Sequence, residues 1–132
     1  FWNIAMRPGK PLMYGRLGRQ RVLGLPGNPV SAFLCARVFL VPLLSALLGE
    51  PAPAHAMQRL RLAGPIEANG PRQHYARART VEVVGERRVL PLASQDSSLL
   101  ATLALADVLI VQPPFAAAAE AGAEVDVLPL DF

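Results

Sequence analysis

The pattern of apolar and polar residues divides the chain into a part with one long apolar segment and a part with short alternating segments. The long segment, Val30–Leu48, has few polar residues, which predicts a helix buried on a sheet. Pro42 is expected to bend or break this helix because proline has no N–H to donate, and Gly49 is a typical C-terminal stop. Three short strands are predicted before the helix, and together they indicate the closing part of an α/β unit: Phe1–Ala5, Met13–Leu17 and Arg21–Leu25.

The second part of the chain is predicted to be mostly β. Alternation of polar and apolar residues, with a turn at Gly85-Glu86, predicts five strands: Gln58–Ala63, His74–Val84, Arg87–Leu92, Asp107–Gln112 and Glu124–Leu128. A short helix is expected at Ser97–Ala106. Five short strands around one helix indicate a small barrel or a sandwich, and the residues alone leave that choice open.

Residues 51–56, PAPAHA, have the composition of a linker between these two parts. We therefore expect an α/β domain at residues 1–50, a linker at 51–56 and a small β-domain at 57–132. No apolar side chain larger than alanine anchors the linker, so the two parts are expected to behave as separate bodies. The β-domain is expected to fold alone, whereas the first part needs strands that its apolar helix can cover.

Charge and hydropathy exclude two classes of partner. A membrane-spanning helix at Val30–Leu48 would place Arg37 near its middle, at a cost of about 2.5–3.5 kcal/mol, so a buried helix is the better explanation. The net charge is +3, but the basic residues are scattered, which argues against a nucleic-acid surface.

No signal peptide is recognisable, and a cytoplasmic location is therefore expected.

Residues that bind metals or act as nucleophiles are sparse. Cys35 is the single cysteine and lies in the apolar helix, where a small buried side chain is the simplest interpretation. His55 and His74 have no partner at metal-ligand spacing. Glu50 is the only carboxylate before Glu67, so ligands for a divalent cation and any general base are expected outside this chain.

The candidate chemistry lies in two loops rich in proline and glycine. In the first loop, R-P-G-K-P, Arg7 and Lys10 flank a rigid turn, from which both cations can point at one ligand. A surface turn with solvated charges is the alternative interpretation.

The second loop, L-P-G-N-P-V-S, opens directly into the apolar helix. Asn28 is a strong N-cap, Pro29 suits the first helical position, and Ser31 offers a hydroxyl in the first turn. Pro26 and Gly27 shape the turn before the cap, and Gly27 can take a positive φ. A helix N-terminus facing two cations is typical of an oxyanion site, although an ordinary capped helix also needs Asn28 and Pro29.

These motifs resemble a known family. The segments FWNIAMRPGKP and LPGNPVSA look like the C-terminal half of the molybdopterin molybdenumtransferases, of the MoeA or gephyrin E-domain type. Three further blocks match the family's small C-terminal β-barrel in order: PRQHYARA, QDSSLLATLALADVLIV and AGAEVDVLPL. The family's N-terminal domains and its acidic, glycine-rich motifs have no counterpart here, so the chain looks like a piece of a longer protein.

The resemblance implies transfer of molybdenum from molybdate into adenylylated molybdopterin, in molybdenum cofactor biosynthesis. It also implies Mg²⁺, with ligands outside this chain, and a homodimer in the full-length protein. The chain alone is expected to be inactive. A non-catalytic interaction module of the gephyrin type is the alternative function.

The resemblance also assigns roles to individual residues. Lys10 and Arg7 are implied as catalytic cations, with Arg7 replacing the family's usual lysine. In the β-domain, the positions that help to bind cofactor or oxyanion are Arg72, Arg77 and Ser97. Asp96 replaces a usual glycine and places a negative charge beside Ser97, while Pro71 stands where glycine is common.

Overall fold

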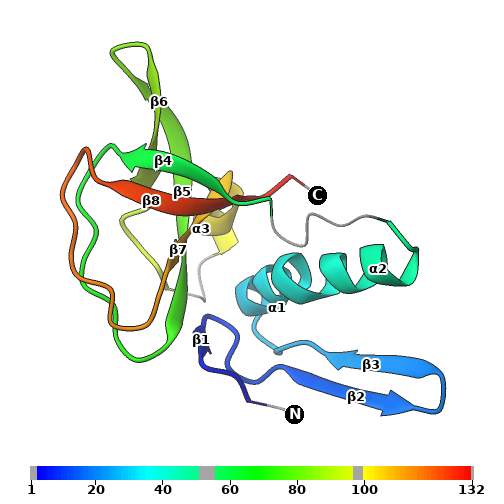
Figure 1. Cartoon of the computed structure of the whole chain (residues 1–132). Coiled ribbons are helices and arrows are strands. Elements are labelled where there is room, and N and C mark those ends of the chain that lie inside the picture. The colour runs from blue at the N-terminus through cyan, green and yellow to red at the C-terminus, as the bar shows by residue number, and fades with distance from the viewer. Residues whose placement is uncertain (1–2, 51–55, 97–99, 132) are drawn as a thin grey trace.

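The computed structural model describes residues 3–50, 56–96 and 100–131, and it shows a β-barrel beside one long helix and a β-hairpin (Figure 1). The N-terminal elements are β1 (Met6–Arg7), β2 (Met13–Leu17), β3 (Gln20–Gly24), α1 (Pro29–Cys35), the π-helical turn η1 (Ala36–Leu40) and α2 (Val41–Leu47). The remaining elements are β4 (Gln58–Leu62), β5 (Gln73–Val83), β6 (Glu86–Pro91), α3 (Leu100–Ala104), β7 (Val108–Gln112) and β8 (Glu124–Pro129).

Five of these strands form a closed barrel in the order β5-β6-β4-β8-β7, because β7 also pairs with β5. The neighbours are antiparallel except for β4 and β6, which run parallel. The interior is filled by small and branched apolar side chains: Leu62, Ala76, Ala78, Val89, Val108, Ile110 and Val127. The barrel is therefore the correct choice over the sandwich, and all five predicted strands are confirmed with small shifts at their ends.

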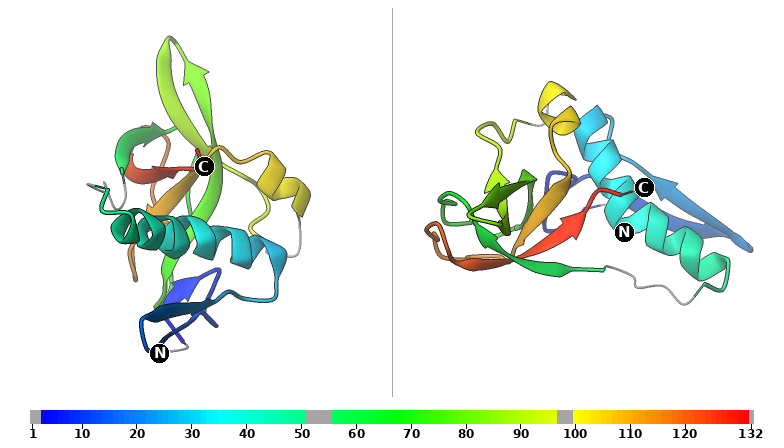
Figure 2. Two further views of the ribbon diagram at one scale, coloured as in Figure 1. Left: turned by 90° about the vertical axis from the view of Figure 1, so that its right-hand side faces the viewer. Right: turned by 90° about the horizontal axis from the view of Figure 1, so that it is seen from above.

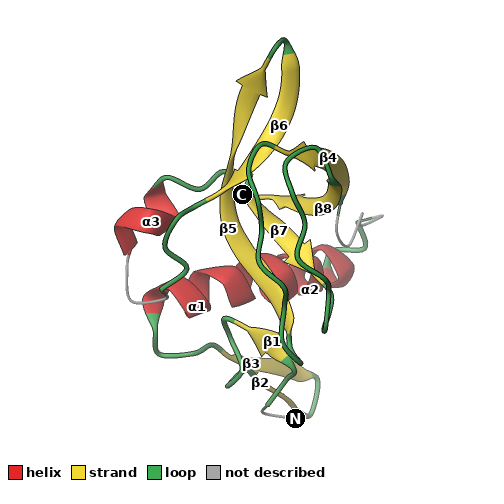
Figure 3. Cartoon of the chain, turned by 90° about the vertical axis from the view of Figure 1, so that its left-hand side faces the viewer, coloured by secondary structure: helices red, strands yellow, loops and turns green. Residues whose placement is uncertain are grey.

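The predicted strand Phe1–Ala5 is wrong where the structure describes it, because residues 3–5 are not extended strand. The strand in this region is β1, which pairs in parallel with the start of β5 through Met6↔Gln73 and Arg7↔His74 (Figure 3). A two-residue strand has no sequence signal of its own, so its position is decided by the partner strand. Residues 1–2 lie outside the described residues.

The long helix begins as predicted at Asn28, whose Oδ1 accepts hydrogen bonds from the backbone N–H of Val30 at 3.0 Å and of Ser31 at 3.2 Å. It ends as predicted at Gly49, which has a φ of 71°. The helix does not break at Pro42, but its regular α-helical hydrogen bonding is interrupted just before that residue, and a bend there stays a prediction. The chain stays helical, and the π-helical turn η1 places Pro42 in the first turn of α2, where the missing N–H is tolerated.

The helix packs against the outer face of the barrel, and the hairpin lies on its other side (Figure 2). One apolar cluster joins Met6 and Leu12, the helix residues Val30, Leu34, Cys35 and Val38, and the barrel residues Tyr75, Leu109 and Leu128. By length and composition Pro29–Leu47 could cross a membrane. The cluster places its first half, from Val30 to Val38, in the core, whereas α2 has no buried residue. Burial raises the pKa of the Cys35 thiol to about 11, in agreement with the predicted buried side chain.

The one charged residue of this apolar helix, Arg37, is accommodated by contacts with the end of the barrel. Its Nε donates a hydrogen bond to the carbonyl of Pro129 at 2.8 Å, and its Nη2 lies 3.6 Å from a carboxylate oxygen of Asp131. The helix is thus tied to the last barrel strand. The shared cluster and this contact do not fit the expectation of two separately moving bodies. The boundary at 51–56 stays a prediction, since residues 51–55 lie outside the described residues.

Candidate functional site

A pocket of about 320 Å³ forms where the R-P-G-K-P loop, the first turn of α1 and the start of β5 meet. We call it the basic pocket, and its lining residues are Arg7, Pro8, Gly9, Lys10, Pro11, Ser31, Arg72, His74 and Gln95. Four of the predicted site residues therefore lie together: Arg7, Lys10, Ser31 and Arg72. Three of the four are cations, which makes this pocket suited to an oxyanion.

Two local features hold the first loop in place. The β1–β5 pairing sets Arg7 opposite His74, next to Arg72 on the approach to β5. Gly9 adopts a φ of 110° against the helix, and a Cβ atom there would stand 2.5 Å from Cys35 Sγ. Only glycine accommodates both the backbone conformation and this contact. The loop is thus seated on the helix that carries Ser31.

The second loop contributes less to the pocket than predicted. Asn28 uses its side-chain oxygen for the helix cap. Pro26 is buried and Gly27 does not have a positive φ, contrary to the expectation that it can take one. Pro26, Gly27, Asn28 and Pro29 do not line the basic pocket. An ordinary capped helix accounts for their conformations, and a binding role for these four stays a prediction.

Arg77 lies behind the wall of the basic pocket. The side chain of Gln95, a pocket residue, brackets its backbone: the Arg77 N–H donates to Oε1, and Nε2 donates to the Arg77 carbonyl, both at 2.8 Å. The Arg77 guanidinium is fully buried, and its Nη2 donates to the Asp96 carbonyl at 3.2 Å. Burial lowers its pKa, and the charge of Asp96 opposes that shift.

Two nitrogens of this guanidinium, Nε and Nη1, have no hydrogen-bond partner among the described residues. A buried unsatisfied donor costs about 1–3 kcal/mol, and an anionic ligand is a natural partner for such a group. Arg77 does not line the basic pocket, so its predicted role in binding cofactor or oxyanion stays a prediction. Ser97 lies outside the described residues, so its predicted role stays a prediction.

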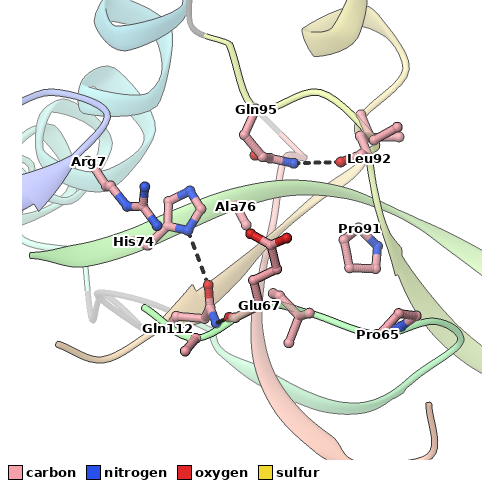
Figure 4. Close-up of a pocket in the computed structure, with 12 residues that line it drawn as sticks. Arg7, Pro65, Glu67, His74, Ala76, Pro91, Leu92, Gln95 and Gln112 are labelled. Atoms are coloured by element: carbon pink, nitrogen blue, oxygen red, sulfur yellow. Dashed lines mark hydrogen bonds between the residues drawn. The ribbon is translucent and has the colours of Figure 1, made fainter. Parts of the chain in front are cut away.

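A second pocket of about 350 Å³, which we call the barrel-mouth pocket, opens at the end of the barrel next to the basic pocket (Figure 4). The two pockets share Arg7, His74 and Gln95. Arg7 Nη2 donates a hydrogen bond to Asn69 Oδ1 at 3.1 Å, and the Asn69 amide donates in turn to backbone carbonyls of Arg72, Gln112 and Pro113. This network joins Arg7 to the barrel mouth.

His74 is held neutral and in one tautomer. Gln112 Nε2 donates to the carbonyl of Glu67 at 2.9 Å, so Gln112 Oε1 faces His74 Nδ1 at 3.1 Å and must accept from it. Nε2 of His74 is then the unprotonated nitrogen. The pKa of His74 is lowered to about 4, chiefly by burial; the hydrogen bond to Gln112 opposes this shift, and the charges of Arg7, Arg77 and Arg72 contribute to it.

Sequence reasoning did not single out the polar residues of the barrel mouth. The available signal was a polar residue on an otherwise apolar strand, as at Gln112 in VLIVQ. Asn69 and Gln95 lie in loops, where no periodicity distinguishes a buried amide from an exposed one. Within residues 3–50, 56–96 and 100–131 there is no group of three His, Cys, Asp or Glu that could hold a metal ion.

Comparison with known proteins agrees with this architecture. Residues 59–130 match the family model described as the MoeA C-terminal region (domain IV), and residues 1–46 match the model described as "Probable molybdopterin binding domain". Molybdopterin molybdenumtransferase 1 of Mycobacterium tuberculosis (strain CDC 1551 / Oshkosh) is 37% identical over 132 aligned residues, which cover 95% of this chain and 31% of that protein. The Haemophilus influenzae molybdopterin molybdenumtransferase is 46% identical over 50 residues, 38% of this chain and 12% of that protein.

A solved structure supports the same assignment. The crystal structure of a molybdopterin biosynthesis MoeA protein from Pyrococcus horikosii matches with a TM-score of 0.78 and 25% identity, over 98% of this chain and 31% of that chain. The barrel and the helix beside it are thus similar in fold to the corresponding part of that MoeA protein. Because the domain IV model matches more than half of its residues, the chain belongs to the MoeA family. It spans about a third of the length of the full-size relatives.

Proposed function

We propose that this chain supplies the oxyanion-binding part of a molybdopterin molybdenumtransferase, which transfers molybdenum from molybdate to adenylylated molybdopterin. The observation that carries the proposal is the basic pocket, in which Arg7, Lys10 and Arg72 face one cavity beside Ser31 in a chain of the MoeA family. Molybdate and the substrate's phosphates are anions, and these three cations offer complementary charge.

The contribution of this chain is electrostatic and positional. Arg7 and Lys10 lie on a loop seated against the helix, so their charges are placed before the ligand arrives, which avoids reorganisation when negative charge develops. Ser31, which is 6% exposed, lines the pocket at the helix N-terminus, where the aligned backbone dipoles favour an anion. Neutral His74 does not add charge to the pocket.

Further parts of the proposal concern the whole protein. Mg²⁺ is proposed to be held by residues outside those described. The full-length protein is proposed to be a cytoplasmic homodimer that does not bind nucleic acid or membranes. The present chain alone is proposed to have no turnover, because its loops lack carboxylates for metal binding or general-base catalysis.

The test is molybdate binding by the complete open reading frame that contains this sequence. Lys10→Ala should weaken binding, measured by isothermal titration calorimetry, by about 1–3 kcal/mol, or roughly 5- to 150-fold, as expected for loss of a charge-assisted hydrogen bond. Arg19→Ala, which removes an exposed cation at the tip of the β2–β3 hairpin, is the matched control and should leave the affinity unchanged.

A Lys10→Ala variant with unchanged molybdate affinity would refute the assignment of this pocket. It would favour the alternative, a non-catalytic interaction module. A variant that loses affinity together with much of its thermal stability would indicate a structural role for Lys10, since an exposed lysine should barely change the melting temperature.

A further inference from the structure

Asn69 is a buried residue in a loop whose neighbouring residues face water. It is 8% exposed, whereas Glu67, Ala68 and Gly70 are exposed. Its backbone N–H donates to the carbonyl of Ala116 at 2.9 Å, which ties the loop to the segment between β7 and β8. Burying a polar side chain costs free energy unless its hydrogen bonds are made, so the partners of this amide indicate what it is for.

The carboxamide of Asn69 is held in one orientation. Its Nδ2 donates to the backbone carbonyls of Arg72 and Pro113, both at 2.8 Å, and to that of Gln112 at 3.2 Å. A flipped amide would turn its oxygen toward three acceptors and its NH₂ group toward a guanidinium, which only donates. Oδ1 is therefore directed at Arg7, whose Nη2 donates to it at 3.1 Å.

This contact leaves most of the Arg7 guanidinium available to a ligand. A guanidinium carries five N–H donors in a fixed plane. Within the described part of the chain, the bond to Asn69 is the only hydrogen bond of the Arg7 side chain. Arg7 lines the basic pocket, whereas Asn69 does not. One edge of the guanidinium is thus fixed by the protein, and its remaining N–H groups can bind an oxyanion.

A fixed orientation matters because the cations of the basic pocket repel one another. Without a ligand, Arg7, Arg72 and Lys10 each favour positions in water away from the other two, where a long side chain also keeps its conformational entropy. The hydrogen bond between Arg7 and Asn69 opposes both effects. The same amide donates to the Arg72 carbonyl, so it also sets the backbone of the second arginine relative to the guanidinium of the first.

We propose that Asn69 is a positioning residue of the basic pocket, which holds the Arg7 guanidinium in the orientation that binds the oxyanion without touching the ligand. The proposal rests on the proposed function and deepens it, because it assigns the residue that organises the site before the ligand arrives. Lys10 is exposed on the same loop as Arg7. Since the Asn69 side chain bonds Arg7, it should act through Arg7 and not through Lys10.

The test is a double-mutant cycle on molybdate affinity, measured by isothermal titration calorimetry on the complete open reading frame that contains this sequence. Asn69→Ala should weaken binding about fivefold or more in the parent protein. In an Arg7→Ala background it should weaken binding about twofold at most, because no guanidinium is left to orient. In a Lys10→Ala background the loss should equal that in the parent protein.

Gln73→Ala is the matched control. It removes a half-buried amide next to Arg72, which donates to Tyr75 Oη at 2.7 Å and does not line the basic pocket. Its molybdate affinity should equal that of the parent protein. A merely structural Asn69 would cause the same loss in every background, so an equal loss in Arg7→Ala overturns the proposal. So does an Asn69→Ala variant that binds molybdate like the parent protein.

Arg7→Lys decides the question if Asn69→Ala does not fold. It keeps the positive charge but replaces the planar guanidinium by one nitrogen, which cannot bond Asn69 and the ligand through separate nitrogens. The molybdate affinity should fall about fivefold or more. An affinity equal to that of the parent protein overturns the proposal, because a charge without a fixed orientation would then be sufficient.

The same titrations separate this inference from the proposed function. If Arg7→Ala and Lys10→Ala lose molybdate affinity and Asn69→Ala does not, the positioning role fails and the oxyanion site stands. If Asn69 and Arg7 are coupled and Lys10→Ala binds like the parent protein, the proposed function fails as assigned and the positioning of Arg7 stands. If none of the three single variants changes the affinity, both fail.

Discussion

Replacing Gly9 by alanine tests how the R-P-G-K-P loop is held against the helix. Gly9 has a φ of 110°, and an added Cβ would meet Cys35 Sγ at 2.5 Å and Met6 Cε at 3.2 Å. The Met6 contact can be relieved at the flexible end of that side chain. Cys35 is fully buried in the cluster that joins helix and barrel, so its sulfur has little room to move.

The expected cost of Gly9→Ala has two parts. The positive φ costs an L-residue about 1–3 kcal/mol, and forcing an extra methyl group into a packed core costs about 1–3 kcal/mol more. The free energy of unfolding should therefore fall by roughly 2–6 kcal/mol. Because Lys10 is the next residue, the loop should also shift and molybdate binding should weaken.

A double-mutant cycle with Cys35→Ala separates the two parts, with stability measured by urea denaturation of the complete protein. Removing the sulfur relieves the steric part of the cost but not the backbone part. The cycle should therefore give a favourable coupling of about 1–3 kcal/mol between the two positions. A coupling near zero would refute the close packing of Gly9 on Cys35. A Gly9→Ala variant as stable as the parent would refute the backbone conformation as well.

Two further predictions concern the helix cap and the buried histidine. Asn28→Ala removes an acceptor from two backbone N–H groups, and it should lower the unfolding free energy by about 0.5–2 kcal/mol in urea denaturation; an unchanged midpoint would contradict the cap. His74 has a pKa of about 4 when folded, against an ordinary value of 6.5. The contribution of neutral His74 to the free energy of unfolding is complete above pH 6.5. As the pH falls to 4, the unfolded chain binds a proton that the folded chain does not, so the free energy of unfolding should fall by on the order of 3 kcal/mol. Denaturation curves at several pH values should show a loss that His74→Gln lacks, and parallel pH profiles for both proteins would contradict it.

Features that depend on neighbouring residues could be predicted from the sequence. The helix start at Asn28-Pro29 and its end at Gly49 were predicted because caps form between residues a few positions apart. The five barrel strands were predicted because alternation of apolar residues marks one buried face. The presence of Arg7 and Lys10 on one rigid turn was also a local property, and the structure places both in the basic pocket.

Features that depend on residues far apart in the chain were decided by the tertiary structure. The two-residue strand β1 exists because β5 offers it a hydrogen-bonding edge, and the barrel closes because β5 is long enough to pair with both β6 and β7. No local pattern places Arg7 beside Asn69 at a separation of 62 positions, or Gln112 beside His74 at 38.

Burial changed the properties of residues whose types were evident from the beginning. Arg77 and His74 both lie in a β-strand. Alternation alone does not say that the Arg77 side chain becomes fully buried, or that the pKa of His74 falls to about 4. Those outcomes depend on what covers each side chain, because removal from water disfavours the charged form. The sequence by itself determined which elements form and which loop carries the cations. The packing of the helix and loop on the barrel decided which of those groups share a pocket.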